Sequence, residues 1–84
     1  MELIKIDEYK NEVARLITYE CGNYIIEMIG EARGKSDIVI TISKSESKDG
    51  ISYVIYGTFR EVTAEVKKHY LDWIKELENK HESN

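Results

Sequence analysis

Proline is absent from this sequence of 84 residues, and cysteine, tryptophan and phenylalanine each occur only once. The single cysteine, Cys21, excludes a disulfide framework within the chain, and we interpret it as a half-buried thiol that packs like a small apolar side chain. Such cysteine usage is typical of a reducing compartment. A chain this short without disulfides must be stabilised by packing or by oligomerisation.

Long apolar runs are also lacking, so no segment reaches the length that a membrane-spanning helix needs. The first ten residues do not contain the uninterrupted apolar core of a signal peptide. We therefore expect a soluble, cytoplasmic protein with one domain over residues 1–84, in which 1–6 form a lead-in and 81–84 a polar tail.

Charge of one sign is only mildly in excess, with a formal net charge of −4. Residues 33–60 carry five basic and three acidic side chains, whereas the segments on either side are acidic. This locally basic centre is too small to indicate nucleic-acid binding without a motif.

The stretch from Asp37 to Thr58 is the clearest pattern in the chain. Ile38, Ile40 and Ile42 alternate with smaller or more polar residues, and the same alternation resumes with Ile51. This spacing predicts two antiparallel strands with the isoleucines facing the core and Thr41 facing outward.

The tip of this hairpin contains Asp49-Gly50, a favoured turn pair. We favour a four-residue loop over 47–50, which pairs Ile42 with Ile55 and Ile38 with Phe59. A two-residue turn, which pairs Ile40 with Phe59, is the alternative. Both registers place the same residues on the same face.

Residues 8–20 are predicted to form a helix, with Asp7 as its N-cap and Gly22-Asn23 as its end. The apolar residues with helical spacing are Tyr9, Val13, Leu16, Ile17 and Cys21. The same stretch allows another interpretation, because residues 16–19 are rich in strand formers and Gly22-Asn23 can turn a hairpin. That alternative is a four-stranded meander with one long C-terminal helix.

A strand is expected over residues 24–32 and a turn over 33–36. The last element is an amphipathic helix that begins between Thr58 and Thr63 and ends near Lys80; Thr58 to Glu61 fits a capping box. Its apolar stripe consists of Val62, Val66, Tyr70, Trp73, Ile74 and Leu77. The fold class is therefore α+β, with an N-terminal helix, a three-stranded antiparallel meander and a C-terminal helix, and with both helices on one sheet face.

The other sheet face is predicted to be the interaction surface. It should display Val39, Thr41, Val54, Tyr56 and Thr58, together with either Ile25 and Ile29 or Tyr24, Ile26 and Met28. This is more apolar than a solvent-facing surface requires, which is typical of a contact surface.

Enzymatic motifs are not evident in the chain. Gly30 to Ser36 resembles a phosphate-binding loop, but it has three residues between its glycines where four are needed, and a strand follows it. His69 and His81 are twelve residues apart and lack ligand partners, and Glu27 and Glu31 are the only carboxylates within an apolar strand. We expect no catalytic residues, no metal and no cofactor.

The expected order of elements resembles that of the double-stranded-RNA-binding domain over about residues 7–80. That family uses a Lys-Lys-x-Ala-Lys motif and a Gly-Pro-x-His loop, whereas this chain has residues 60–65 and 32–36 in those places, with Glu61 and Glu65 repelling phosphate. The candidates for nucleic-acid binding are Arg33, Lys35, Lys44, Lys48 and Arg60.

These observations favour a non-enzymatic protein-interaction module that forms a homodimer or binds another protein. Small acidic domains of this kind could serve as adaptors or inhibitors, including ones encoded by phages or other mobile elements. Nucleic-acid binding through the basic side of the hairpin is the alternative function.

Overall fold

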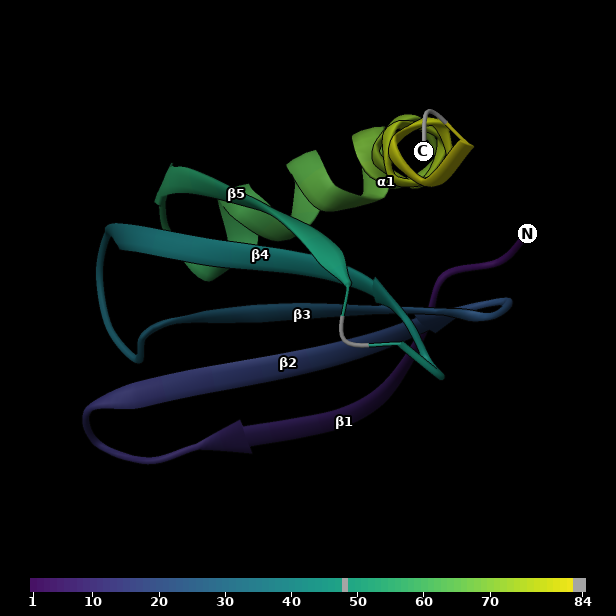
Figure 1. Cartoon of the computed structure of the whole chain (residues 1–84). Helices are drawn as coiled ribbons and strands as arrows, with labels where there is room; N and C mark the ends of the chain where they lie inside the picture. Colours follow the sequence, from purple (N-terminus) through teal and green to yellow (C-terminus); the bar gives the residue numbers. More distant parts are fainter. Residues whose placement is uncertain (48, 83–84) are drawn as a thin grey trace.

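The computed structural model describes residues 1–47 and 49–82, with side chains up to residue 80. It contains a five-stranded antiparallel sheet in which each strand pairs with its neighbours in the sequence, followed by a helix (Figure 1). The elements are β1 (Ile4–Lys10), β2 (Ala14–Cys21), β3 (Tyr24–Glu31), β4 (Ser36–Lys44), β5 (Gly50–Gly57) and α1 (Phe59–Glu82). The class is α+β, as the sequence predicted.

The predicted N-terminal helix over residues 8–20 is wrong, because this stretch forms the end of β1, a turn and most of β2. Asn11 fixes the turn: its Oδ1 accepts hydrogen bonds from the backbone N–H groups of Val13 and Ala14, both at 2.8 Å. Pairing of β2 with β3 over eight residue pairs then satisfies the backbone of β2. The alternative meander fits better, although the sheet has one strand more, and the resemblance to the double-stranded-RNA-binding domain does not hold.

Two expected helix ends have other roles. Gly22, with φ of 59°, lies in the tight turn between β2 and β3, where a left-handed conformation favours glycine. Asp7, predicted as an N-cap, lies in β1 just after an irregularity in the pairing with β2. Such an irregularity, together with the charged residues of β1, protects an edge strand from pairing with other chains.

The central hairpin has the predicted faces but a different register. Ile42 pairs with Ile51 and Ile38 pairs with Ile55, so the connection is longer than either predicted loop. Gly50 belongs to β5 and not to a tight turn. A Cβ atom at this position would lie 2.5 Å from the carbonyl oxygen of Ile42, so the close approach of the two strands requires glycine.

Helix α1 begins at Phe59 because residues 58–61 form a capping box. The N–H of Glu61 donates to Oγ1 of Thr58 at 3.1 Å, and the N–H of Thr58 donates to Oε1 of Glu61 at 3.0 Å. Phe59 therefore leaves the sheet, which is why it does not pair with Ile38 or Ile40. The predicted stripe is confirmed: Val62, Val66, Ile74 and Leu77 are buried, and Tyr70 and Trp73 pack against the core.

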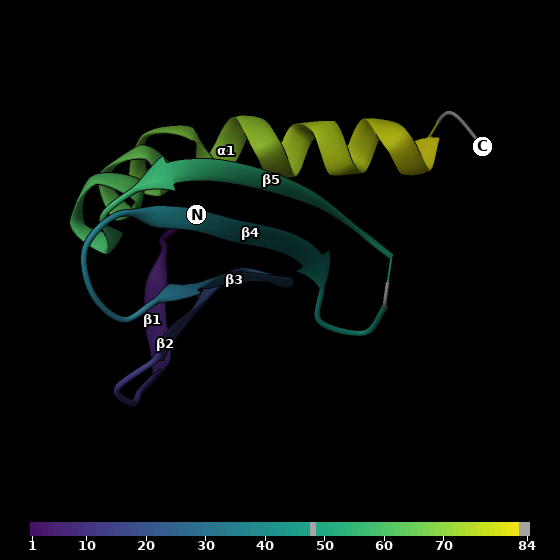
Figure 2. The same cartoon turned by 90° about the vertical axis from the view of Figure 1, so that its left-hand side faces the viewer.

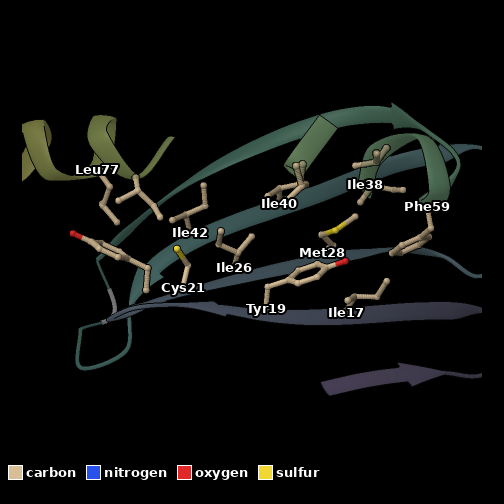
Figure 3. Packing of buried hydrophobic residues seen from close by; sticks show 14 residues of the cluster. Ile17, Tyr19, Cys21, Ile26, Met28, Ile38, Ile40, Ile42, Phe59 and Leu77 are labelled. Carbon is tan, nitrogen blue, oxygen red and sulfur yellow. The ribbon is translucent and has the colours of Figure 1, made fainter. Parts of the chain in front are cut away.

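The core lies between one sheet face and α1. Figure 3 shows side chains of β2, β3 and β4 on the same side of the sheet as Phe59 and Leu77 of the helix. Ile38, Ile40 and Ile42 have no exposed surface, as their alternation predicted. Helix α1 packs mainly on β4 and β5, and β1 and β2 extend away from it in both views (Figures 1 and 2). Within the described residues no second layer covers the opposite face of the sheet.

Candidate interaction surface on the open sheet face

The sheet face that points away from α1 is here called the open face. Because side chains alternate along a strand, the register of the five strands fixes its members. They are Ile4, Asp7, Tyr9, Ala14, Leu16, Thr18, Glu20, Ile25, Glu27, Ile29, Glu31, Asp37, Val39, Thr41, Ser43, Ser52, Val54 and Tyr56.

One apolar row crosses the whole open face. The register pairs Tyr9 with Leu16, Leu16 with Ile29, Ile29 with Val39, and Val39 with Val54. These five residues, one from each strand, are here called the apolar row. At about 4.8 Å between strands, the row spans roughly 19 Å.

Four of the five residues of the apolar row are exposed to solvent, and Leu16 is half-buried. Tyr9 is 57% exposed, Ile29 48% and Val54 61%, and neighbouring Tyr56 is 67% exposed. Single exposed apolar residues are ordinary, but a continuous row on an uncovered face is typical of a contact surface.

The charges of the open face all have one sign. It carries five carboxylates, those of Asp7, Glu20, Glu27, Glu31 and Asp37, and no lysine or arginine within the described strands. The next row along the strands is polar, and in it Oγ1 of Thr41 lies 3.3 Å from Oγ of Ser52. The apolar row is thus bordered by polar and acidic side chains.

Four of the five predicted surface residues lie on this face, namely Val39, Thr41, Val54 and Tyr56. Thr58 does not, because β5 ends at Gly57 and the Thr58 hydroxyl caps α1. Of the two sets left open for the predicted strand 24–32, the structure places Ile25 and Ile29, in β3, on the open face. Tyr24, Ile26 and Met28 are buried in the core.

Sequence reasoning missed the contribution of β1 and β2, which supply Tyr9 and Leu16. The signal was present as period-two alternation: Leu16, Thr18 and Glu20 lie on the open face, whereas Ile17, Tyr19 and Cys21 are buried. Both sets contain apolar residues, and for this reason a helical spacing could be found in the same stretch.

The predicted nucleic-acid-binding residues do not form one surface. Arg33, Lys35 and Arg60 lie near the β3–β4 turn and the start of α1, where Nζ of Lys35 is 3.9 Å from Oε1 of Glu61. Lys44 lies at the other end of β4, roughly 26 Å away along the strand. Lys48 lies outside the described residues.

An aromatic cluster joins α1 to β5. The rings of Tyr53 and Trp73 are stacked with centroids 4.8 Å apart. The ring of His69 is tilted against that of Trp73, with centroids 5.7 Å apart. The Tyr53 hydroxyl donates a hydrogen bond to Glu76. Burial, followed by this hydrogen bond, raises the pKa of Tyr53 to about 12. Nε2 of His69 also lies 3.2 Å from Oε2 of Glu65, four residues earlier on the same helix.

Other candidate groups for chemistry are not gathered together. Glu27 is half-buried and Glu31 is exposed, and both belong to the open face. Cys21 is fully buried, and burial raises the pKa of its thiol. No group of three or more metal-ligating side chains occurs in residues 1–47 and 49–82, and the side chain of His81 lies outside the described part. No helix in this part of the chain is long and apolar enough to span a membrane.

Comparison of the chain with protein-family models, with curated proteins and with solved structures finds no match.

Proposed function

We propose that this chain is a small non-enzymatic protein-interaction module, an adaptor or inhibitor, that binds a partner protein on the open face of its sheet. The observation that carries the proposal is the apolar row, which crosses all five strands on a face that α1 leaves uncovered. A small domain gains more than a large one by burying such a row against a partner.

The charges of the open face define the chemistry of the partner. The open face carries five carboxylates and, among its described strand residues, no lysine or arginine, which favours a partner surface with basic side chains around an apolar strip. A second copy placed face to face would bring five carboxylates against five, which is unfavourable. A homodimer through this face was predicted from the sequence, and the repulsion between these carboxylates disfavours it.

The binding proposal is tested with a synthetic strand-forming peptide in which lysine alternates with valine, titrated into ¹⁵N-labelled protein. We expect amide shifts along the apolar row and loss of binding with added salt. Val54→Lys, at an exposed edge position, removes an apolar contact and adds a repelling charge, so affinity should fall by roughly tenfold or more.

The matched control is Leu71→Lys, which makes the same change at an exposed apolar residue of α1, 44% exposed. The affinity of this variant for the peptide should equal that of the wild type, and the circular dichroism spectra of both variants should match that of the wild type. Equal weakening by both variants, or shifts confined to the helix side, would contradict the proposal.

Self-association is measured in parallel by light scattering over a range of concentrations. If the protein is a monomer at all concentrations, the result agrees with the proposal that the open face binds a different, basic protein. A dimer that Tyr56→Glu dissociates would instead show that the open face pairs with itself, as the sequence led us to expect.

A further inference from the structure

A second surface feature lies on the opposite side of the sheet, between the first half of α1 and strands β1 and β2. Two adjoining hollows of about 450 and 360 Å³ share Arg15, Thr63 and Lys67 in their walls. Phe59, Arg60 and Ala64 complete one hollow, and Leu3, Lys5, Ile17 and Tyr19 complete the other. Together they are here called the basic trough.

All charged residues that line the basic trough are cations: Lys5, Arg15, Arg60 and Lys67. Within the described residues, Arg60 and Lys67 have no ion-pair partner. This concentration of positive charge contrasts with the net charge of −4 of the whole chain. Unpaired cations around a hollow attract an anionic ligand.

Arg15 is held in place before any ligand arrives. Its Nε and Nη2 donate to Oε2 of Glu8 at 2.9 and 2.6 Å, and its guanidinium lies 5.1 Å from the centre of the Phe59 ring. A guanidinium has five N–H groups, so donors remain for a ligand. A cation that is already oriented loses less entropy when it binds an anion.

Helix α1 supplies the other wall. Arg60, Thr63 and Lys67 are spaced by three and four residues and therefore share one face of the helix. The Thr63 hydroxyl lies between the two cations along the helix and can donate a hydrogen bond. The three side chains extend over roughly 10 Å of helix.

We propose that the basic trough binds a compact polyphosphate group, such as the di- or triphosphate of a small molecule. Several phosphate charges close together match the cations of Arg15, Arg60 and Lys67, and the volume suits a ligand of this size. A nucleic-acid strand fits less well, because these cations are gathered around two adjoining hollows, whereas a strand needs a basic groove that follows its backbone.

The test is a titration of ¹⁵N-labelled protein with sodium tripolyphosphate, with affinity measured by calorimetry. We expect amide shifts at Arg15, Arg60, Thr63 and Lys67. Lys67→Gln should weaken binding by roughly tenfold, since it removes a charged contact to the ligand.

Lys68→Gln is the matched control, because it removes the same charge from the next residue of α1, which does not line the trough. Its affinity should stay within about twofold of the wild type. Equal losses in the two variants would show only general charge attraction and overturn the proposal. So would an absence of binding, or tighter binding of a twenty-nucleotide RNA than of tripolyphosphate.

Discussion

Tyr53 connects the edge strand β5 to helix α1 by two contacts, the stack on Trp73 and the hydrogen bond to Glu76. Burial of the phenol, followed by its hydrogen bond to Glu76, favours the protonated form and raises the pKa of Tyr53 to about 12. In an unfolded chain a tyrosine ionises near pH 10. The folded state therefore holds this proton more tightly than the unfolded state does.

From this difference we predict a loss of stability at high pH. The contribution of Tyr53 is complete below about pH 10 and is lost as the pH rises toward 12. Urea unfolding at several pH values between 9 and 11.5 measures it. Tyr53→Phe should show a shallower decline than the wild type, whereas Tyr56→Phe, on the exposed open face, should follow the wild type. Parallel curves for wild type and Tyr53→Phe would contradict the assignment.

At the scale of elements, the sequence predicts the features that depend on local alternation. Prediction fails where the same residues fit both the two-residue period of a strand and the 3.6-residue period of a helix. The facing of Ile38 and Ile40 and the apolar stripe of α1 could be read directly, because few alternatives share those patterns. The start of α1 was only bracketed between Thr58 and Thr63, because strand alternation also allowed Phe59 in the sheet. Residues 8–20 could not, since Tyr9, Val13 and Leu16 also fit a helix and only pairing with β3 decides for a strand. The contribution of β1 and β2 to the open face was missed because of that single error.

The register of the β4–β5 hairpin depends on a different kind of information. Parity alone sets the faces, and both predicted loops had the right parity. The actual register is set by where Phe59 leaves the sheet and by the close approach of Gly50 to Ile42. Neither is visible as a repeat in the sequence, although Gly50 and the capping box were both recognisable as special positions.

The capping box at the β5–α1 junction gives the prediction at this scale. Thr58→Ala leaves the N–H of Glu61 without its partner and should lower the free energy of unfolding by about 1 kcal/mol. Thr58→Ser keeps the hydroxyl and should stay within about 0.5 kcal/mol of the wild type. Chemical denaturation of the three proteins decides it; an equal loss in both variants would mean that the threonine methyl group, and not the hydrogen bond, stabilises the junction.

At the scale of the whole molecule, the core is a single layer between the sheet and one helix. Its far end includes Cys21 of β2, which has no exposed surface although it lies beyond the strands that α1 mainly covers. A buried thiol of raised pKa reacts only when this layer opens. Cys21 is thus a natural probe of how cooperatively the sheet and helix hold together.

We predict that an aromatic disulfide reagent labels Cys21 in the native protein more slowly than in denaturant by roughly three orders of magnitude or more. As a control, Ser45→Cys in a Cys21→Ala chain places the thiol in an exposed connection, where it should react at nearly the denatured rate. Fast labelling of native Cys21 would show that β2 separates from the core without global unfolding.

The carboxylates of the open face and the cations of the basic trough lie on opposite sides of one thin sheet. The domain consequently has an electric dipole directed through the sheet. The field of a charged partner would orient the domain before the two molecules come into contact. Its rate of encounter would then vary with ionic strength even where its final affinity does not. A basic partner on the open face and an anionic ligand in the basic trough could also be bound at the same time, because the two surfaces lie on opposite sides of the sheet.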